Sequence, residues 1–471
     1  MTTSPKHNTK KVVVAGATGF IGTCLGEQLG DQVELVGLSR ADRTPPKGYH
    51  ECRSVDLFSR ADSIRALQGT DIAIYLVHSM IPSARLVQAD FQDLDLLCAD
   101  NFGRAAAANE VQHIIYVSGL IPQDEALSDH LHSRLEVERA LSAHGVPTTT
   151  LRAGMVVGAR GSSFQILARL VRRLPVMLCP KWTKTQTQPV ALDDVIAVIS
   201  ALLYEAPKRS RSYDLGTPEV ISYRELMSRL AEIMKVKRYF LPVPFVSPSL
   251  SRLWVSLTTG APAALARPLI NSLRHTMVVR DEQKYRHPAE PLTPIDTMLQ
   301  EAWVHSLSGS HQTPRAFQAA PAKPEEDKVV SVQRMILPDG KSAEWATKEY
   351  MLWLPKSFWG ILPIRVDTER NQVRFYLWGW SKPLLKLALA EYASGSDRQV
   401  LFVKGGVLAK AKTTGRLEFR QVLDDHTLLI GLVDFEPMLP WWLYRVTQAL
   451  AHRMVMSRFR KHLIKLQQKK P

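Results

Sequence analysis

Short apolar runs alternate with helical patterns over the first half of the chain. Six runs have the length and composition of buried strands: Lys11–Ala15, Val33–Leu38, Tyr49–Val55, Ile72–Val77, His113–Ser118 and Thr148–Arg152. Apolar residues at helical spacing occupy stretches between and after these runs: Gly22–Gly30, Ala61–Leu67, Ala89–Asn109, Ser133–His144, Leu192–Glu205 and Tyr223–Met234. Strands that alternate with helices predict an α/β fold with a doubly wound parallel sheet.

A different pattern occupies the last third of the chain. Four candidate strands are separated by turns that contain Gly, Asp and Ser, and they are Arg374–Trp380, Gln399–Val403, Gly415–Val422 and Thr427–Asp434. A long helical pattern then runs from about Pro440 to Gln467. We therefore expect a C-terminal α+β domain, helix-grip-like in outline, in which an antiparallel sheet wraps the long terminal helix around an apolar cavity.

Between the two patterns the apolar periodicity is lost. Leu250–Leu273 has a helical pattern, but charges and prolines interrupt it, so we do not expect it to span a membrane. His305–Asp327 is rich in Ser, Gly, Gln, Pro and Ala, which is typical of a linker. The predicted organisation is a first domain over residues 1–305 with a small substrate lobe, a linker over 306–327 and a second domain over 328–471.

Composition excludes several classes of protein. The 471-residue chain is 45% hydrophobic, which is enough for ordinary cores, and no signal peptide or membrane-spanning run is evident. Its four cysteines have no paired or metal-like spacing, and they are Cys24, Cys52, Cys98 and Cys179. This usage favours a reducing cytoplasm and predicts neither a disulfide framework nor a metal site.

Positive charge is concentrated after the predicted linker. From Lys328 onward there are 24 Lys and Arg against 12 Asp and Glu, whereas the whole chain has a net charge of +15. The surface of the second domain could face an anionic membrane or nucleic acid, or it could simply be solvated. We do not expect nucleic-acid binding, because no helix-turn-helix, zinc-finger or RNA-recognition motif is present.

The last helical pattern carries much of this charge. It begins at Trp441 and Trp442 and ends in a basic cluster: Arg458, Arg460, Lys461, His462, Lys465, Lys469 and Lys470. Apolar residues at helical spacing lie between the charges: Leu450, Met454, Phe459, Leu463 and Leu466. A basic amphipathic helix suits peripheral contact with the inner face of a membrane, although basic residues in the last turns also complement the helix dipole.

The most specific motif is a glycine-rich turn after the first predicted strand. The strand runs directly into Gly16-Ala17-Thr18-Gly19-Phe20-Ile21-Gly22, and a helical pattern follows. A turn of this kind presents the unpaired N–H groups of a helix start, and its glycines let a pyrophosphate approach the backbone. The sequence therefore predicts a Rossmann-type dinucleotide site, although the spacing Gly-x-x-Gly-x-x-Gly is a variant of the usual fingerprint.

Polar residues follow the next predicted strands, whose carboxyl ends form the ligand crevice of such a sheet. Ser39 and Arg40 stand where an acidic residue would hold the ribose of NAD, so the cation favours NADP(H) over NAD(H). Asp56, beside Leu57, either accepts a hydrogen bond from the adenine amino group or caps the following helix. The residues that end later strands are expected in the same crevice, and they are Val77, His78, Ser79 and Ser118.

These motifs resemble the extended and atypical branches of the short-chain dehydrogenase/reductase superfamily. Besides the glycine run, the similarity is carried by Asp56, Ser118, Leu151–Gly154, Gly158 and Pro189–Val195. Two further segments, Tyr75–Met80 and His130–Glu138, resemble a bacterial NmrA-like group of NAD(P)-binding proteins that carry a C-terminal domain of unknown function. The resemblance covers roughly residues 10–305 and implies an NAD(P) cofactor.

One departure from the superfamily pattern concerns the chemistry. The superfamily uses a Tyr-x-x-x-Lys pair as acid/base and ribose anchor, but this chain has His130 at the tyrosine position and Arg134 at the lysine position. The resemblance implies Ser118, His130 and Arg134 as catalytic candidates, with Arg134 also on the cofactor ribose. Histidine can transfer protons near neutral pH, and arginine keeps the positive charge.

Three functions fit these features. The first is an NADP(H)-dependent oxidoreductase that acts on a lipophilic carbonyl or quinone-like compound, and the retained Ser118 and Arg134 favour it. The second is a non-catalytic NADP-sensing or scaffold protein, which the missing Tyr-Lys pair favours. The third is a carrier that holds a hydrophobic ligand in the C-terminal domain. Trp182 and Phe164 either line an apolar substrate pocket or belong to the core.

Overall fold

The chain divides into two compact units. The computed structural model describes residues 10–78, 86–122, 127–243, 272–286, 292–308, 328–357, 364–367, 371–376, 379–409, 415–423 and 426–468. Unit 1 comprises Met1–Met80 and Cys98–Ala320, and unit 2 comprises Ile81–Leu97 and Pro321–Pro471. The predicted domain ranges keep residues 81–97 with the first domain, whereas the structure groups them with unit 2. Most of the predicted helix Leu250–Leu273 lies outside the described residues.

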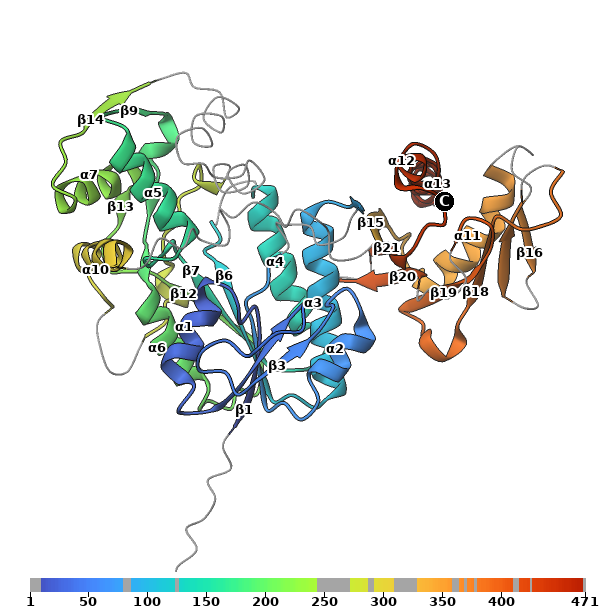
Figure 1. Cartoon of the computed structure of the whole chain (residues 1–471), viewed down its shortest axis with the longest axis horizontal. Helices are drawn as coiled ribbons and strands as arrows, with labels where there is room; N and C mark the ends of the chain where they lie inside the picture. Colours follow the sequence, from blue (N-terminus) through green and yellow to red (C-terminus); the bar gives the residue numbers. More distant parts are fainter. Residues whose placement is uncertain are drawn as a thin grey trace, which may run out of the picture. The chain divides into compact units, whose positions relative to one another are not determined.

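The central sheet of unit 1 has seven strands in the order β12-β7-β6-β4-β1-β2-β3 (Figure 1). Their bounds are β1 Lys11–Ala15, β2 Glu34–Ser39, β3 Glu51–Ser54, β4 Ile72–Tyr75, β6 His113–Gly119, β7 Thr148–Ala153 and β12 Arg211–Leu215. Every neighbouring pair is parallel, which confirms the doubly wound parallel sheet expected from the alternating pattern. The strand order reverses at β1, and sheets of this kind bind ligands beyond the strand ends at such a point.

Helices cover both faces of this sheet (Figure 1). Helices α1 (Phe20–Leu29) and α6 (Leu192–Leu202) pack on one face through an aliphatic core. The other face carries α2 (Arg60–Ala66), α3 (Phe91–Ala108) and α4 (Asp129–Ser142). Helix α4 begins four residues before the predicted start at Ser133, because the side chain of Ser128 caps it by accepting from the Leu131 N–H.

A small lobe completes unit 1. It contains the helices α5 Ser162–Arg173, α7 Tyr223–Ile233 and α10 Ile295–Ser308, and the short helical turns η1 Lys181–Lys184 and η2 Asp281–Gln283. Three strand pairs join them: β8 Val156–Val157 with β11 Val190–Ala191, β9 Val176–Cys179 with β14 Tyr239–Pro242, and β10 Gln186–Thr187 with β13 Ile221–Ser222. Phe164 is fully buried in the core of this lobe, so it is a packing residue.

Unit 2 is built on an eight-stranded sheet in the order β16-β17-β18-β19-β20-β21-β15-β5. The bounds are β15 Val329–Ile336, β16 Ile364–Asp367, β17 Gln372–Phe375, β18 Leu385–Leu389, β19 Arg398–Gly405, β20 Arg416–Val422, β21 Thr427–Phe435 and β5 Leu86–Gln88. All neighbours are antiparallel except β5, which pairs in parallel with β15. The sheet is therefore mixed, because a strand from the first third of the chain joins its edge.

The helices of unit 2 are α11 Ala343–Ser357, α12 Trp441–Val446 and α13 Gln448–Gln468, with a short turn η4 at Glu391–Ala393. The buried core of the unit combines residues of α11 and α13 with residues of the sheet. The predicted terminal helix is thus present, but it is broken at Thr447, whose φ of −121° and ψ of −83° are not helical. The α+β architecture is confirmed, whereas the helix-grip relationship and its cavity remain predictions.

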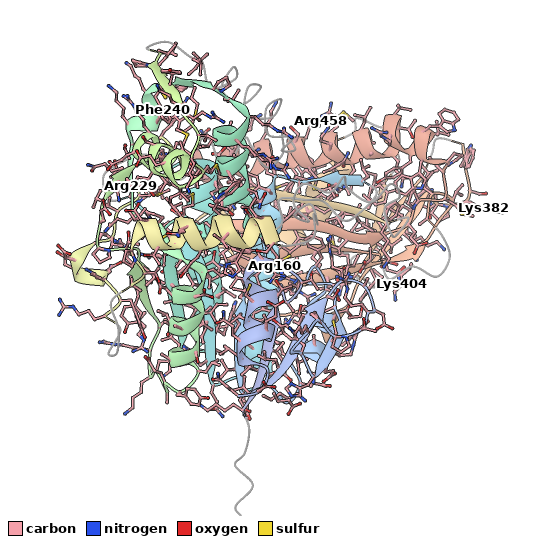
Figure 2. The ribbon with its side chains drawn as sticks, turned by 60° about the vertical axis from the view of Figure 1, so that its left-hand side comes forward. Arg160, Arg229, Phe240, Lys382, Lys404 and Arg458 are labelled. Carbon is pink, nitrogen blue, oxygen red and sulfur yellow. The ribbon has the colours of Figure 1, made fainter. Side chains whose placement is uncertain are left out.

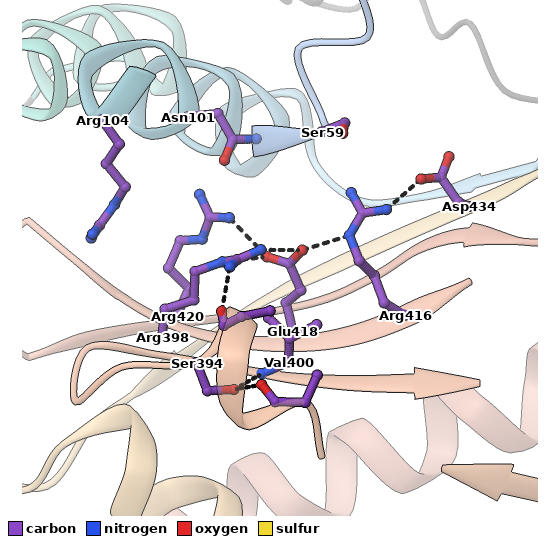
Figure 3. Close-up of polar contacts among 12 residues, drawn as sticks. Ser59, Asn101, Arg104, Ser394, Arg398, Val400, Arg416, Glu418, Arg420 and Asp434 are labelled. Carbon is purple, nitrogen blue, oxygen red and sulfur yellow. Dashed lines mark hydrogen bonds and ion pairs between the residues drawn. The ribbon is translucent and has the colours of Figure 1, made fainter. Parts of the chain in front are cut away.

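A buried ionic network lies on three neighbouring strands of unit 2 (Figure 3). The Glu418 carboxylate accepts hydrogen bonds from Arg398 (2.9 and 3.1 Å), Arg416 (2.6 Å) and Arg420 (2.7 Å), and Arg416 also pairs with Asp434. Burial alone would raise the pKa of Glu418, but the three guanidinium groups hold it well below the usual range. Such a network fixes the register of the strands as long as all its members are charged.

Candidate functional site

The glycine turn between β1 and α1 forms a cradle that side chains would fill. Gly16 has a φ of +95°, which L-residues rarely adopt. A Cβ on Gly22 would lie 2.3 Å from the Gly16 carbonyl oxygen and 2.7 Å from the Ala17 Cα, so the helix can approach the turn this closely only with glycine. The turn is closed by the Gly19 N–H, which donates to the Gly16 carbonyl over 2.9 Å.

The start of α1 has the electrostatics of an anion site. Gly19 is the N-cap and offers no side chain, and the first turn of α1 contains no acidic residue. The partial positive charge of the helix start is therefore not neutralised from within its own first turn. Helix starts of this kind bind phosphate groups through backbone N–H donors. The cradle fits the pyrophosphate of a dinucleotide.

The other residues predicted from this turn have different roles. Ala17 is fully buried, and Ile21 packs against the aliphatic core, so their side chains hold the helix in place. The Phe20 ring occupies the space that Gly158 and Gly161 leave open, since a Cβ on either glycine would come within about 3 Å of ring atoms. Thr18 lies half-buried in the turn itself.

The ends of β2 and β3 supply the groups beside the turn. Ser39 is the buried last residue of β2, and Arg40 follows it with an exposed side chain. Half-buried Arg43 lies close enough to the Cys52 thiol to lower its pKa, although burial has the larger effect and raises that pKa. Two arginines therefore follow the end of β2, and the preference for NADP(H) stays a prediction.

Asp56 and Leu57 follow β3, where the sequence left two roles open. The Asp56 carboxylate accepts a hydrogen bond from the Phe58 N–H over 3.0 Å, and the Leu57 carbonyl accepts one from Asn101 over 2.8 Å. Helix α2 has its own cap, because Ser59 accepts from the Asp62 N–H. Asp56 thus shapes the turn before the helix, and a role toward adenine stays a prediction.

A second group of side chains gathers where β4 and β6 end and α4 begins. The rings of His78 and His130 lie 5.1 Å apart between centroids. Arg134, one turn after His130, donates from Nη1 to the Tyr116 hydroxyl over 3.4 Å. Ser118 is 7% exposed, and its hydroxyl has no hydrogen-bond partner among the residues that the structure describes. A buried hydroxyl without a partner is costly unless a ligand or water satisfies it.

Tyr116 was not among the residues predicted from the sequence. It is fully buried, its ring lies 5.9 Å from that of Tyr75, and its hydroxyl is the acceptor for Arg134. The signal that could have found it is the period of two along a strand, because Tyr116 stands two residues before Ser118 and shares its face of the sheet. Ser79, predicted for the crevice, lies outside the described residues.

The strand order divides these groups into two halves around β1. The glycine turn, Arg40 and Asp56 follow β1, β2 and β3, whereas His78, Ser118 and α4 belong to β4, β6 and the helix after β6. An extended dinucleotide that crosses the end of β1 would therefore meet the glycine turn on one side and the group that contains His78 and Ser118 on the other. Among the described residues no cluster of His, Cys, Asp or Glu is arranged to hold a metal ion.

Comparisons with known proteins bear on the fold. The auxiliary protein GraX of Staphylococcus aureus is 34% identical over 142 residues, which are 30% of this chain and 43% of GraX, so less than half of GraX is matched. A triphenylmethane reductase of Citrobacter sp. has 18% identity and a TM-score of 0.50 over 62% of this chain and 99% of its own. A nucleoside-diphosphate-sugar epimerase of S. aureus has 18% identity and a TM-score of 0.49 over 62% and 100%.

No protein-family model matches the chain. The structural likeness concerns the fold alone: the first part of the chain, with its doubly wound parallel sheet, has the fold of the triphenylmethane reductase. The fold expected from the glycine run and the strand alternation is confirmed. Within the part of the chain that the structure describes, no helix is both long and apolar enough to cross a bilayer.

Proposed function

We propose that the chain is an NADP(H)-dependent oxidoreductase that acts on a lipophilic carbonyl or quinone-like compound. The observation that carries the proposal is the glycine cradle at the start of α1, because only glycine at position 22 lets the helix pack this closely on the turn and no acidic residue in the first turn opposes an anion there. The backbone of Gly16–Gly22 would hold the pyrophosphate, and Arg40 would pair with the 2′-phosphate. When bound, the nicotinamide ring supplies or accepts a hydride.

The residues on the other side of β1 would serve the substrate. Ser118 would donate a hydrogen bond to the substrate oxygen, which would satisfy its buried hydroxyl. His130 would hold the proton that this oxygen takes up, and the neighbouring ring of His78 limits where the imidazole can turn. Arg134, anchored on the Tyr116 hydroxyl, would keep positive charge beside the ribose and the developing alkoxide.

An aromatic pair in the small lobe supports an apolar substrate. The Trp182 and Tyr223 rings lie edge to face with centroids 6.4 Å apart, and burial raises the pKa of Tyr223 to about 12. The buried Trp182 indole N–H has no partner among the described residues, so a polar atom of a bound aromatic compound could accept from it. The four cysteines are thiols that form no disulfide, which supports the cytoplasmic location that we propose.

A non-catalytic NADP sensor is the second candidate. The replacement of the Tyr-Lys pair by His130 and Arg134 favours it, because a histidine side chain is shorter than a tyrosine. In this alternative the same cradle binds the dinucleotide, but Ser118→Ala changes nothing that can be measured as turnover.

The test is dinucleotide binding and turnover by the full chain. Gly19→Val points a branched side chain toward the anion and should abolish NADPH binding in calorimetry, whereas Gly395→Ala, where a Cβ meets only ordinary contacts, should not. With NADPH and a panel of quinones and aldehydes, we expect His130→Ala to lower kcat at least about 100-fold and Ser118→Ala about 10- to 100-fold.

The controls lie on the same helix. His132→Ala and Ser142→Ala remove an exposed imidazole and a hydroxyl that donates to the Glu138 carbonyl, so they should leave kcat unchanged. NADPH binding without turnover across the panel would favour the sensor. Undetectable binding of either dinucleotide to the wild type would exclude both candidates.

A further inference from the structure

Helices α12 and α13 carry an unusual charge. The segment Trp441–Gln468 contains six Lys and Arg and no Asp or Glu. All six are exposed: Arg445, Arg453, Arg458, Arg460, Lys461 and Lys465. Basic residues at a helix end can be explained by the helix dipole, but here they occur from the first helix to the last turn of the second. The helix dipole therefore does not explain why basic residues occur along the whole length of both helices.

The same helices also expose four large apolar side chains, which are called the exposed row here. Trp442 is 70% exposed, Val446 60%, and Leu450 and Met454 44% each. Trp442 and Val446 are four residues apart on α12, and Leu450 and Met454 are four residues apart on α13, so each pair lies on one side of its own helix. Exposed apolar groups that are contiguous mark a surface that binds something.

The inward face of α13 is already occupied. Met456, Phe459 and Leu463 are at most 1% exposed and belong to the core of unit 2. The sequence assigned Phe459 and Leu463 to the apolar side of a membrane-binding helix, and the structure corrects this assignment because both pack against the sheet. The exposed row is thus a second apolar face, and it has no role in the core.

On the solvent-exposed side of α13, the apolar residues are followed by cationic residues. Lys461 and Lys465 stand seven and eleven residues after Met454, which keeps them on the same side of α13 as Leu450 and Met454. Arg453 flanks the row, and Arg458 is labelled on this helix in Figure 2. The surface, defined here as the outer face of α12–α13, has an aromatic and aliphatic first half and a basic second half.

We propose that the outer face of α12–α13 docks on the surface of a bilayer that contains anionic phospholipids. A helix in this position buries its apolar side chains among the upper acyl chains, its tryptophan lies at the interface, and its cations meet the headgroup phosphates. Nucleic acid would also attract the cations, but it would press Trp442, Val446 and Leu450 against phosphates. A second copy of this chain would bring two sets of six like charges together, which is repulsive.

The test is co-sedimentation of the full chain with lipid vesicles of defined composition. We expect binding to vesicles of phosphatidylcholine with phosphatidylglycerol, weaker binding to phosphatidylcholine alone, and loss of the difference at high salt. Because each surface cation contributes about 1 kcal/mol, Arg453→Gln with Lys461→Gln should weaken binding about 25-fold. Trp442→Ser with Leu450→Ser should weaken it on both kinds of vesicle.

Matched double variants on the sheet side of unit 2 serve as controls. Lys382→Gln with Lys404→Gln removes the same charge from exposed positions (Figure 2). Tyr392→Ser with Val407→Ser removes two exposed apolar groups, which are 85% and 41% exposed. Neither pair should change vesicle binding, and circular dichroism should show that all four proteins are folded.

Three results would overturn the proposal. One is no binding to anionic vesicles by the folded wild type. Another is that the control variants weaken vesicle binding as much as the α12–α13 variants do, which would mean that the net charge or overall hydrophobicity of the protein determines binding. The third is binding of duplex DNA, or concentration-dependent self-association in sedimentation, that the α12–α13 variants abolish while vesicle binding persists. None of these readouts depends on NADPH turnover, so the proposal can fail or hold independently of the catalytic one.

Discussion

At the end of β2, one exposed side chain carries the proposed preference for NADP(H). Arg40 follows the buried Ser39 and has solvent access, whereas Arg43 is half-buried and lies near Cys52. A guanidinium group can pair bidentately with a phosphate, and it offers no acceptor for the 2′-hydroxyl that NAD has in place of the 2′-phosphate. In the proposed function, Arg40 would therefore discriminate through attraction to the 2′-phosphate.

Removal of that side chain should change the affinity for only one of the two dinucleotides. We expect Arg40→Ala to weaken NADP binding about 10- to 100-fold, since a hydrogen bond to a charged group contributes about 1.5–3 kcal/mol, and to leave NAD binding unchanged. Isothermal titration of both dinucleotides measures this. Arg65→Ala, an exposed arginine on α2, is the control. Equal weakening of NAD and NADP would mean that Arg40 supports the fold of the turn instead.

At the scale of elements, local signals predicted unit 1 well. The glycine turn, the alternation of strands and helices, and the strand ends are all encoded within short stretches, so β1, α1 and the position of Ser118 followed from the sequence. The start of α4 was placed too late, because the cap at Ser128 precedes the apolar pattern. This matters for the site, since His130 lies in the first turn of the helix.

Other elements had no local signal. Strand β5 has three residues, and its partner β15 begins about 240 residues later, so only the folded chain shows the pairing. The period of two along β6 could have placed Tyr116 on the same face as Ser118, but its hydrogen bond with Arg134 from a neighbouring helix has no signal within the strand. Contacts between distant segments decide such features, and periodicity within one segment does not report them.

The pairing of β5 with β15 makes the stability of the unit 2 sheet depend on residues 86–88. Val87 lies opposite Val330, and proline there would remove an N–H and strain the strand. We expect Val87→Pro to speed hydrogen exchange of the amides of Val329–Ser331 at least about tenfold, equivalent to about 1.4 kcal/mol, without affecting β1. Val87→Thr, which keeps the backbone pairing, should not. If amide exchange in Val329–Ser331 were unchanged in both variants, pairing with β21 alone would be sufficient to protect the amides of β15.

At the scale of the whole molecule, the described part of each unit contains an imidazole whose pKa is lowered by burial. In unit 1, His113 is 1% exposed and lies 2.8 Å from the Thr149 hydroxyl, and burial together with the charge of Arg211 lowers its pKa to about 4. In unit 2, burial lowers the pKa of His452 on α13 to about 4. In the unfolded chain these two imidazoles become protonated near pH 6.5, whereas in the folded units they become protonated only at a lower pH.

Acid should consequently weaken both units over the same pH range. Between about pH 6.5 and 4 the unfolded state binds more protons than the folded state, so the free energy of unfolding falls as the pH is lowered and stops falling from this cause below about 4. His113→Gln should remove this fall, about 3 kcal/mol, from unit 1 only, and His452→Gln from unit 2 only, so that each variant is the control for the other. Hydrogen exchange of β6 and β21 amides, compared with wild type at each pH, separates the units. A parallel change in both units for either variant would mean that the two unfold as one cooperative body, and the units would then share a single stability.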